Sequence, residues 1–330
     1  MTKVVRKHNI ALLPSKVETF LEVWNHKFKA SYIALLFLVT GCSSHSNVWF
    51  AKKDQAAQPA VILATPLQVT YQNELALARL GQLLSSDKLN SVQRAALFYE
   101  RGVMFDKVGL QTMARIDFSR ALHEKPDFAE AYNFMGVYLT QQQDYDNAFD
   151  AFDSAIELQP SYDYAYLNRG IALYYANRPE LAQKDMETFQ SRKEDDPYRA
   201  LWLFLVDVKL DPAKALQNIS AIYDKHHTDE WGWNIVAVYA GKQSAADFIS
   251  HIPDAANSNK ELAEHLCEAY FYLAKMAQLQ GSPEQANAYF KLSLANNVYD
   301  FIEHRYALLE LQLANQAPNP YPDSNEFEAE

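Results

Sequence analysis

Apolar and polar residues follow a helical period over most of this chain. From Val69 onward, apolar positions recur three and four residues apart, as at Leu77, Leu80 and Leu84. This spacing places apolar side chains along one face of an α-helix, whereas an exposed strand would need strict alternation. The pattern therefore predicts an all-α fold.

A second, longer period is superimposed on the helical one. Gly102, Gly136 and Gly170 are spaced 34 residues apart. The same interval relates an aromatic position (Phe98, Tyr132, Tyr166), a small one (Ala114, Ala148, Ala182) and a large apolar one (Phe118, Phe152, Met186). This pattern resembles the 34-residue tetratricopeptide repeat (TPR), which implies a solenoid of helix pairs.

Simple sterics explain the repeated residues. A small residue such as Gly136 lets two antiparallel helices approach closely, and large aromatic side chains fill the space that remains. Pro126 and Pro160 end the first two units, because proline cannot donate a backbone hydrogen bond within a helix and disfavours helix in the residue before it. We therefore expect a helix crossing of the same kind in each unit.

Elements outside the regular repeats complete the expected organisation. Residues from Cys267 to Phe290 have the spacing of a fourth repeat, and residues 198–258 are helical in period without the repeat signature. The predicted segments are a signal peptide (1–41), a flexible tether (42–66), N-terminal helices (67–94), three repeats (95–128, 129–162 and 163–197), divergent helix pairs (198–258), a TPR-like fourth repeat (259–297), a terminal capping helix (298–314) and a disordered tail (315–330).

The N-terminus carries the pattern of an exported protein. An apolar run from Ser31 to Val39 follows a basic stretch and precedes Cys42. The run is far shorter than the roughly 20 residues that span a bilayer, and it suits a secretory signal. The sequence from Val39 to Cys42 resembles the lipobox of bacterial lipoproteins, which implies lipidation of Cys42. The resemblance also implies that Ser43, directly after this cysteine, directs the protein to the outer membrane. An ordinary signal peptide with an incidental cysteine is the alternative, and the long segment before the run is unusual for either.

Charge narrows the range of partners. The chain has a net charge of −11, and residues 42–330 alone hold 24 Lys and Arg against 39 Asp and Glu. An acidic body repels phosphate, so we expect it to bind neither nucleic acid nor anionic lipid headgroups. Membrane attachment would therefore depend on a lipid at Cys42, since several acyl chains at one terminus anchor stably.

No candidate chemistry emerges from the remaining motifs. The sequence lacks the common hydrolase, phosphate-binding and zinc signatures, so we expect no enzyme, no cofactor and no metal. Cys267 lies in an apolar run and is expected to be a small buried residue. The aromatic groups at Trp231, Trp233 and Tyr174 fit packing between helices, with a partner interface as the alternative.

By analogy with TPR modules, one face of each first helix lines a concave binding groove. None of the residues expected there is a lysine or arginine, which disfavours a clamp for a terminal carboxylate and favours extended or helical segments of a partner protein. The candidate groove residues are Tyr99, Val103, Asp106, Glu130, Asn133, Val137, Thr140, Tyr164, Leu167, Ile171 and Tyr174.

Four strings carry a more specific resemblance. They are Tyr99 to Val103, Asn168 to Tyr175, Trp231 to Val236 and Glu303 to Leu311. Together they make the chain similar to the NlpI-type lipoproteins of Gram-negative outer membranes. The resemblance implies a homodimeric periplasmic adaptor that binds a tail-specific protease of the Prc type, together with murein endopeptidases and other peptidoglycan hydrolases. A structural TPR lipoprotein in outer-membrane protein assembly is the alternative, and a hydrolase with a hidden site is a third.

Overall fold

A computed structural model describes residues 61–316 of the chain. The signal peptide, Cys42, most of the tether and nearly all of the expected tail lie outside these residues. The described part is all-α, as the sequence predicts, and contains no strand between residues 61 and 316. Its helices are α1 (Tyr71–Leu84), α2 (Ser91–Lys107), α3 (Gln111–Glu124), α4 (Ala129–Gln141), α5 (Tyr145–Leu158), α6 (Asp163–Tyr175), α7 (Pro179–Ser191), α8 (Pro197–Leu210), α9 (Pro212–His226), α10 (Gly232–Tyr239), α11 (Ala245–His251), the short 3₁₀ helix η2 (Pro253–Ala255), α12 (Asn259–Leu279), α13 (Pro283–Leu294) and α14 (Ile302–Gln316).

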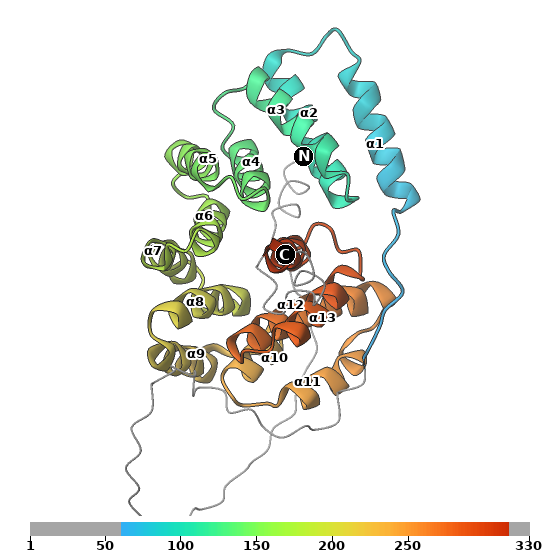
Figure 1. The fold of residues 1–330 in the computed structure, drawn as a ribbon. Coiled ribbons are helices and arrows are strands. Elements are labelled where there is room, and N and C mark those ends of the chain that lie inside the picture. The colour runs from blue at the N-terminus through green and yellow to red at the C-terminus, as the bar shows by residue number, and fades with distance from the viewer. Residues whose placement is uncertain (1–60, 317–330) are drawn as a thin grey trace, which may run out of the picture.

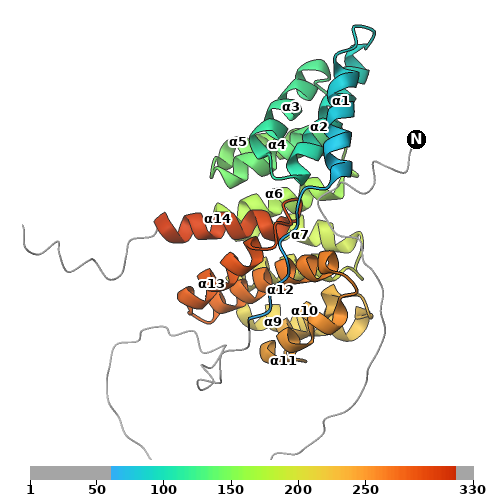
Figure 2. The same ribbon diagram turned by 90° about the vertical axis from the view of Figure 1, so that its right-hand side faces the viewer.

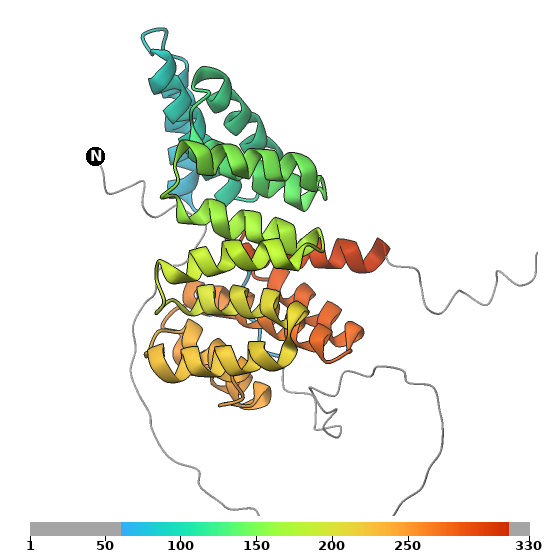
Figure 3. The same ribbon diagram turned by 90° about the vertical axis from the view of Figure 1, so that its left-hand side faces the viewer.

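The 34-residue period corresponds to three helix pairs, α2 with α3, α4 with α5, and α6 with α7. In each pair a glycine of the first helix lies against a large residue of the second. A Cβ atom added to Gly136 would come within 2.6 Å of the Phe152 ring, and one added to Gly102 within 2.9 Å of Phe118. The expected crossing geometry is therefore present, and Figure 3 shows helices of the repeats stacked in successive layers.

The first repeat begins earlier than its expected start at residue 95. Helix α2 begins at Ser91, because Asn90 and Gln93 form a reciprocal capping box at its N-terminus. The segment 67–94, predicted to hold more than one helix, therefore contains only α1 and the first turn of α2.

The second half of the chain continues the stack less regularly. Helices α8 and α9 pack as a pair, and α12 and α13 pack as another, with the short helices α10 and α11 between them. Gly232 allows α10 to approach α8, since a Cβ there would come within 2.6 Å of Pro197. The whole chain of pairs curves into an arc (Figure 1).

The last helix does not cap the end of this stack. Helix α14 lies inside the arc and is viewed nearly end-on at its centre in Figure 1. It packs against α12, α13 and also α4 of the second repeat. The prediction of a terminal capping helix is therefore wrong in its placement, because α14 is buried on two sides and joins the two ends of the arc.

The end of the expected tether is held against the body. Tyr270 of α12 both accepts a hydrogen bond from the Ile62 backbone N–H (3.0 Å) and donates one to the Ile62 carbonyl (2.8 Å). Thr65 pairs through its backbone with the side chain of Asn259. Residues 61–66 are thus docked on α12, contrary to a flexible tether extending to residue 66, and Figure 2 shows this segment running beside the C-terminal helices.

Candidate functional site

The candidate groove residues lie on the inner helices α2, α4 and α6, as the repeat pattern predicts. The open groove expected there is not present. Nine of the eleven side chains are buried, and only Glu130 and Tyr164 are half-buried. The buried ones are Tyr99, Val103, Asp106, Asn133, Val137, Thr140, Leu167, Ile171 and Tyr174. Whether any of the eleven residues binds a partner stays a prediction.

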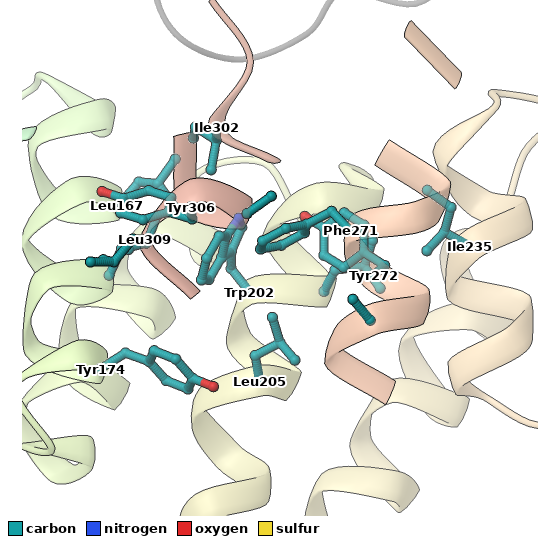
Figure 4. Close-up of a cluster of buried hydrophobic side chains, with 14 of the residues drawn as sticks. Leu167, Tyr174, Trp202, Leu205, Ile235, Phe271, Tyr272, Ile302, Tyr306 and Leu309 are labelled. Carbon is teal, nitrogen blue, oxygen red and sulfur yellow. The ribbon is translucent and has the colours of Figure 1, made fainter. Parts of the chain in front are cut away.

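Helix α14 accounts for much of this burial. Figure 4 shows Tyr306 and Leu309 of α14 facing Leu167 of α6 and Trp202 of α8. The Tyr306 ring stacks on Tyr175 with the centroids 5.3 Å apart. An aromatic pair in this geometry contributes about 0.5–1.5 kcal/mol beyond the area it buries. The inner face of the repeats is therefore filled by a helix of the same chain.

One charged contact fixes α14 against the first two repeats. Arg305, which is fully buried, donates to Asp106 of α2, and Tyr138 of α4 donates to the same carboxylate. Burial would lower the pKa of Arg305, but the neighbouring Asp106 and Tyr138 raise it above its ordinary value. Asp106 therefore belongs to an internal ion pair and is not free to contact a partner.

A second buried pair fixes α14 to α12. Lys275 Nζ lies 2.5 Å from Glu310 Oε1, and the Tyr175 hydroxyl donates to the same oxygen at 2.9 Å. Although burial opposes ionisation, the contact with Lys275 holds the pKa of Glu310 below its ordinary value. Removing either charge would leave the other unpaired in the interior, which is strongly destabilising.

Asn133, expected to hold a partner's backbone, is also used internally. Its side-chain carbonyl accepts a hydrogen bond from Asn168 at 2.9 Å, and its amide donates to the Tyr162 hydroxyl at 3.3 Å. The two asparagines lie on the first helices of successive repeats, 35 residues apart, so Asn168 is one position beyond the residue equivalent to Asn133. They connect α4 to α6 and leave the Asn133 side chain little capacity for a partner.

The tryptophans of the Trp231 to Val236 string are core residues. Trp231 and Trp233 are both buried. The Trp231 indole donates to Glu268 at 2.7 Å and stacks on the His265 ring at 3.9 Å between centroids. Burial raises the pKa of Glu268 well above its ordinary value and lowers that of His265 to about 4. These aromatic side chains therefore pack between helices of the same chain.

A polar cleft remains open at the edge of the buried face. It lies between α3, the end of α4 and the outer side of α14, and has a volume of about 160 Å³. Its lining residues are Gln111, Thr112, Arg115, Tyr138, Gln141, Gln142, Leu308, Leu309 and Gln312. The sequence analysis missed this site, because Arg115 lies on the second helix of a repeat, outside the positions that line a TPR groove.

Apolar residues are also exposed at the N-terminal end of the stack. Helix α1 has no buried residue, although it contains Leu75, Leu80 and Leu83. Tyr71 and Leu75 are 75% and 55% exposed. Within residues 61–316 this helix packs mainly on α2. The apolar side chains that face away from α2 are therefore not covered by another helix of this part of the chain.

Two further features bear on the candidate chemistry. Cys267 is fully buried beside Ser293, as expected for a small core residue, and burial raises the pKa of its thiol.

Among the residues that the structure describes, no three His, Cys, Asp or Glu side chains are grouped as a metal site would need. No helix in that part of the chain is long and apolar enough to cross a membrane.

No protein-family model matches the chain. Among solved structures it is similar to a TPR protein from Parabacteroides merdae, with 17% identity and a TM-score of 0.45, covering 73% of this chain and 92% of that one. PilF of Pseudomonas aeruginosa matches at 16% identity and a TM-score of 0.41 (74% and 90% covered). YrrB, described as a TPR protein with an unusual peptide-binding site, matches at 16% and 0.40 (64% and 98%).

Proposed function

We propose that this chain is a lipid-anchored periplasmic adaptor. In this proposal Cys42 carries the lipid, and the helical repeats bind a tail-specific protease together with peptidoglycan hydrolases. Bringing the protease and a murein endopeptidase together would regulate the turnover of the endopeptidase and so cell-wall growth and division. The protein itself would catalyse nothing.

The observation that carries the proposal is the set of three TPR-type helix pairs built on one crossing geometry. Gly102, Gly136 and Gly170 each lie against a large residue of the paired helix, at a Cβ approach of 2.6 to 2.9 Å. Stacked pairs of this kind present extended surfaces, which suit binding to other proteins. The sequence strings shared with NlpI-type lipoproteins support the choice of protease and hydrolases as partners.

The exposed side of α1 supports the expected homodimer. A helix that exposes Tyr71 and Leu75 leaves apolar area in contact with water, and covering it with a second copy would be favourable. A twofold dimer would place the same patch on both protomers. The dimer is tested by the sedimentation of the full chain against a variant with Leu75→Asp, which we expect to be monomeric.

Affinity purification from native membranes tests the adaptor role. We expect the wild-type chain to recover a periplasmic protease and cell-wall hydrolases, and a deletion strain to accumulate an endopeptidase. An unchanged endopeptidase level, with no hydrolase recovered, would contradict the proposal. Recovery of the machinery that inserts β-barrels would favour the alternative, a structural role in outer-membrane assembly.

The anchor is tested separately. The Cys42→Ala variant should lose its fractionation with the outer membrane, because an acidic body is not attracted by charge to anionic lipid headgroups. A variant that still fractionates with the outer membrane would refute lipidation at this position. A Cys267→Ala variant, altering the other cysteine, serves as the matched control.

A further inference from the structure

The polar cleft between α3, α4 and α14 differs from the two buried ion pairs that hold α14. The charged groups beside it, Asp106, Arg305 and Glu310, are all buried in ion pairs. Apart from Tyr138, which donates to Asp106, the polar side chains that line the cleft have no such partners within residues 61–316. Within residues 61–316, six of them make no side-chain hydrogen bond or ion pair, namely Gln111, Thr112, Arg115, Gln141, Gln142 and Gln312.

Arg115 gives the cleft a positive charge. It is exposed and lies on the first turns of α3, whose N-cap residue, Leu110, provides no side-chain cap. A guanidinium binds a carboxylate through two parallel hydrogen bonds. Arg115 makes no ion pair with any residue between 61 and 316, so its charge is available to an anion in the cleft.

The remaining lining residues can complete the recognition of a peptide end. Side-chain amides of glutamine both donate and accept. Within residues 61–316 the Oε1 atom of Gln141 is buried and has no hydrogen-bond partner. A rotation of this side chain toward the cleft would let it accept the last backbone N–H of a peptide whose carboxylate contacts Arg115. The Leu309 and Tyr138 side chains, both buried, supply an apolar wall.

The size of the cleft suits one terminal residue. Its volume of about 160 Å³ is more than ten times the roughly 10–15 Å³ that a single water needs by the same measure. A carboxylate with one aliphatic side chain would fit, whereas a folded domain would not enter. The cleft is therefore scaled to a chain end.

We propose that this cleft binds the free C-terminal carboxylate of a partner polypeptide, with an apolar last residue, and that Arg115 provides the charge. The TPR groove positions, which contain no cation, disfavour such binding on the sequence alone. The cation comes instead from the second helix of the first repeat, and α14 supplies the opposite wall. The inference deepens the adaptor proposal, on which it rests for the identity of the partner as a protein.

Fluorescence polarisation with a matched pair of peptides tests the inference. The peptides are one N-terminally labelled hexapeptide ending in leucine, with either a free carboxylate or a carboxamide, added to the full-length chain in detergent. We expect the carboxylate form to bind roughly tenfold more tightly, and the difference to shrink as salt is raised.

Two charge variants locate the site. Arg115→Gln should bind both peptides equally weakly, whereas Arg79→Gln, which removes an exposed arginine of α1, should keep the preference for the carboxylate. Equal binding of the two peptides by the wild type, or no binding of either at millimolar concentration, would overturn the inference. It would also fail if Arg115→Gln kept the preference, or if Arg79→Gln lost it to the same degree.

The outcome is separable from that of the adaptor proposal. If the peptides are not distinguished but protease and hydrolases are recovered from membranes, the cleft assignment fails and the adaptor stands. If the peptides are distinguished but neither protease nor hydrolases are recovered, the assignment of those partners fails and the cleft remains a peptide-end site.

Discussion

The regular repeats, α2 to α7, and the irregular half, α8 to α14, are held together by different means. In the repeats, glycines lie under large side chains, and the ion pair of Arg101 with Asp117 recurs as Arg169 with Asp185. Both of those arginines stay partly exposed. In the irregular half, charged groups such as Lys275 and Glu310 are enclosed completely by neighbouring helices.

This difference separates local order from long-range order. A glycine crossing involves two helices that follow one another along the chain, so each repeat can form with its neighbour alone. The buried pairs join distant segments, as Arg305 does with Asp106 across 199 residues. The repeats therefore provide the curved frame, and the buried charges fix α14 at one place inside it.

Breaking one buried pair should have the largest effect. Lys275→Met leaves Glu310 without its cation in the interior, and we expect a loss of about 3–5 kcal/mol in the free energy of unfolding. Lys260→Met, which breaks the exposed pair with Glu264 (3.1 Å), should change stability by less than about 0.5 kcal/mol. Urea unfolding measures both. Equal effects of the two variants would show that the buried pair stabilises the protein no more than the exposed pair does.

The pH dependence of stability should also come from the irregular half. Burial raises the pKa of Glu303 to about 7, whereas in the unfolded chain it titrates near 4.5. The contribution of Glu303 to the free energy of unfolding is therefore fully present below pH 4.5 and is lost as the pH rises through 7.

Glu303→Gln should remove this loss, because a neutral amide can still accept from the Tyr272 hydroxyl, 3.1 Å from the native carboxylate. Relative to wild type, the variant should gain on the order of 1–3 kcal/mol between pH 5 and pH 8. Thermal unfolding at the two pH values measures the difference. Parallel curves for the two proteins would mean that Glu303 does not titrate on unfolding.

Filling a glycine crossing should disturb the repeats to a smaller degree. An alanine at position 136 would bring a methyl group to 2.6 Å from the Phe152 ring, and overpacking of this kind costs about 1–3 kcal/mol. Gly81→Ala in α1 meets nothing nearer than 4.0 Å and should stabilise the helix by about 0.5–1 kcal/mol. Calorimetry distinguishes the two; a neutral Gly136→Ala would indicate that the crossing is looser than the structure shows.

The weakest expected effect concerns the docked segment before α1. Tyr270→Phe removes the hydroxyl that pairs with both backbone groups of Ile62, at a cost of about 1 kcal/mol. Limited proteolysis should then cut within residues 61–66 faster than in wild type. Tyr289→Phe, which removes the hydroxyl of a neighbouring half-buried tyrosine of α13 that accepts from Gln285, should leave the rate unchanged. If both variants are cut alike, the hydroxyl of Tyr270 does not hold the segment.

The sequence predicted the contacts between helices that are adjacent in the chain and missed the contacts between helices that are far apart in it. The crossings at Gly102, Gly136 and Gly170 follow from the 34-residue repeat of small and large residues, because each crossing joins two helices that are adjacent in the sequence. The position of α14 does not follow, because a helical period marks its apolar faces without showing what covers them. Arg305 and Glu310 look like solvent-facing charges in the sequence, since their partners lie on other helices. Arg115 was overlooked for a similar reason, because its cleft exists only where α14 reaches α3 and α4.

Hydrogen exchange across α14 tests the central structural claim most directly. If α14 is a permanent part of the inner face, the backbone amides from Arg305 to Glu310 should exchange as slowly as those of α12, and peptides bound in the cleft should leave them unchanged. Fast exchange of α14 beside a protected α12 would contradict the account. It would mean that the inner face opens, and that the repeat groove and not the cleft is the surface available to partners.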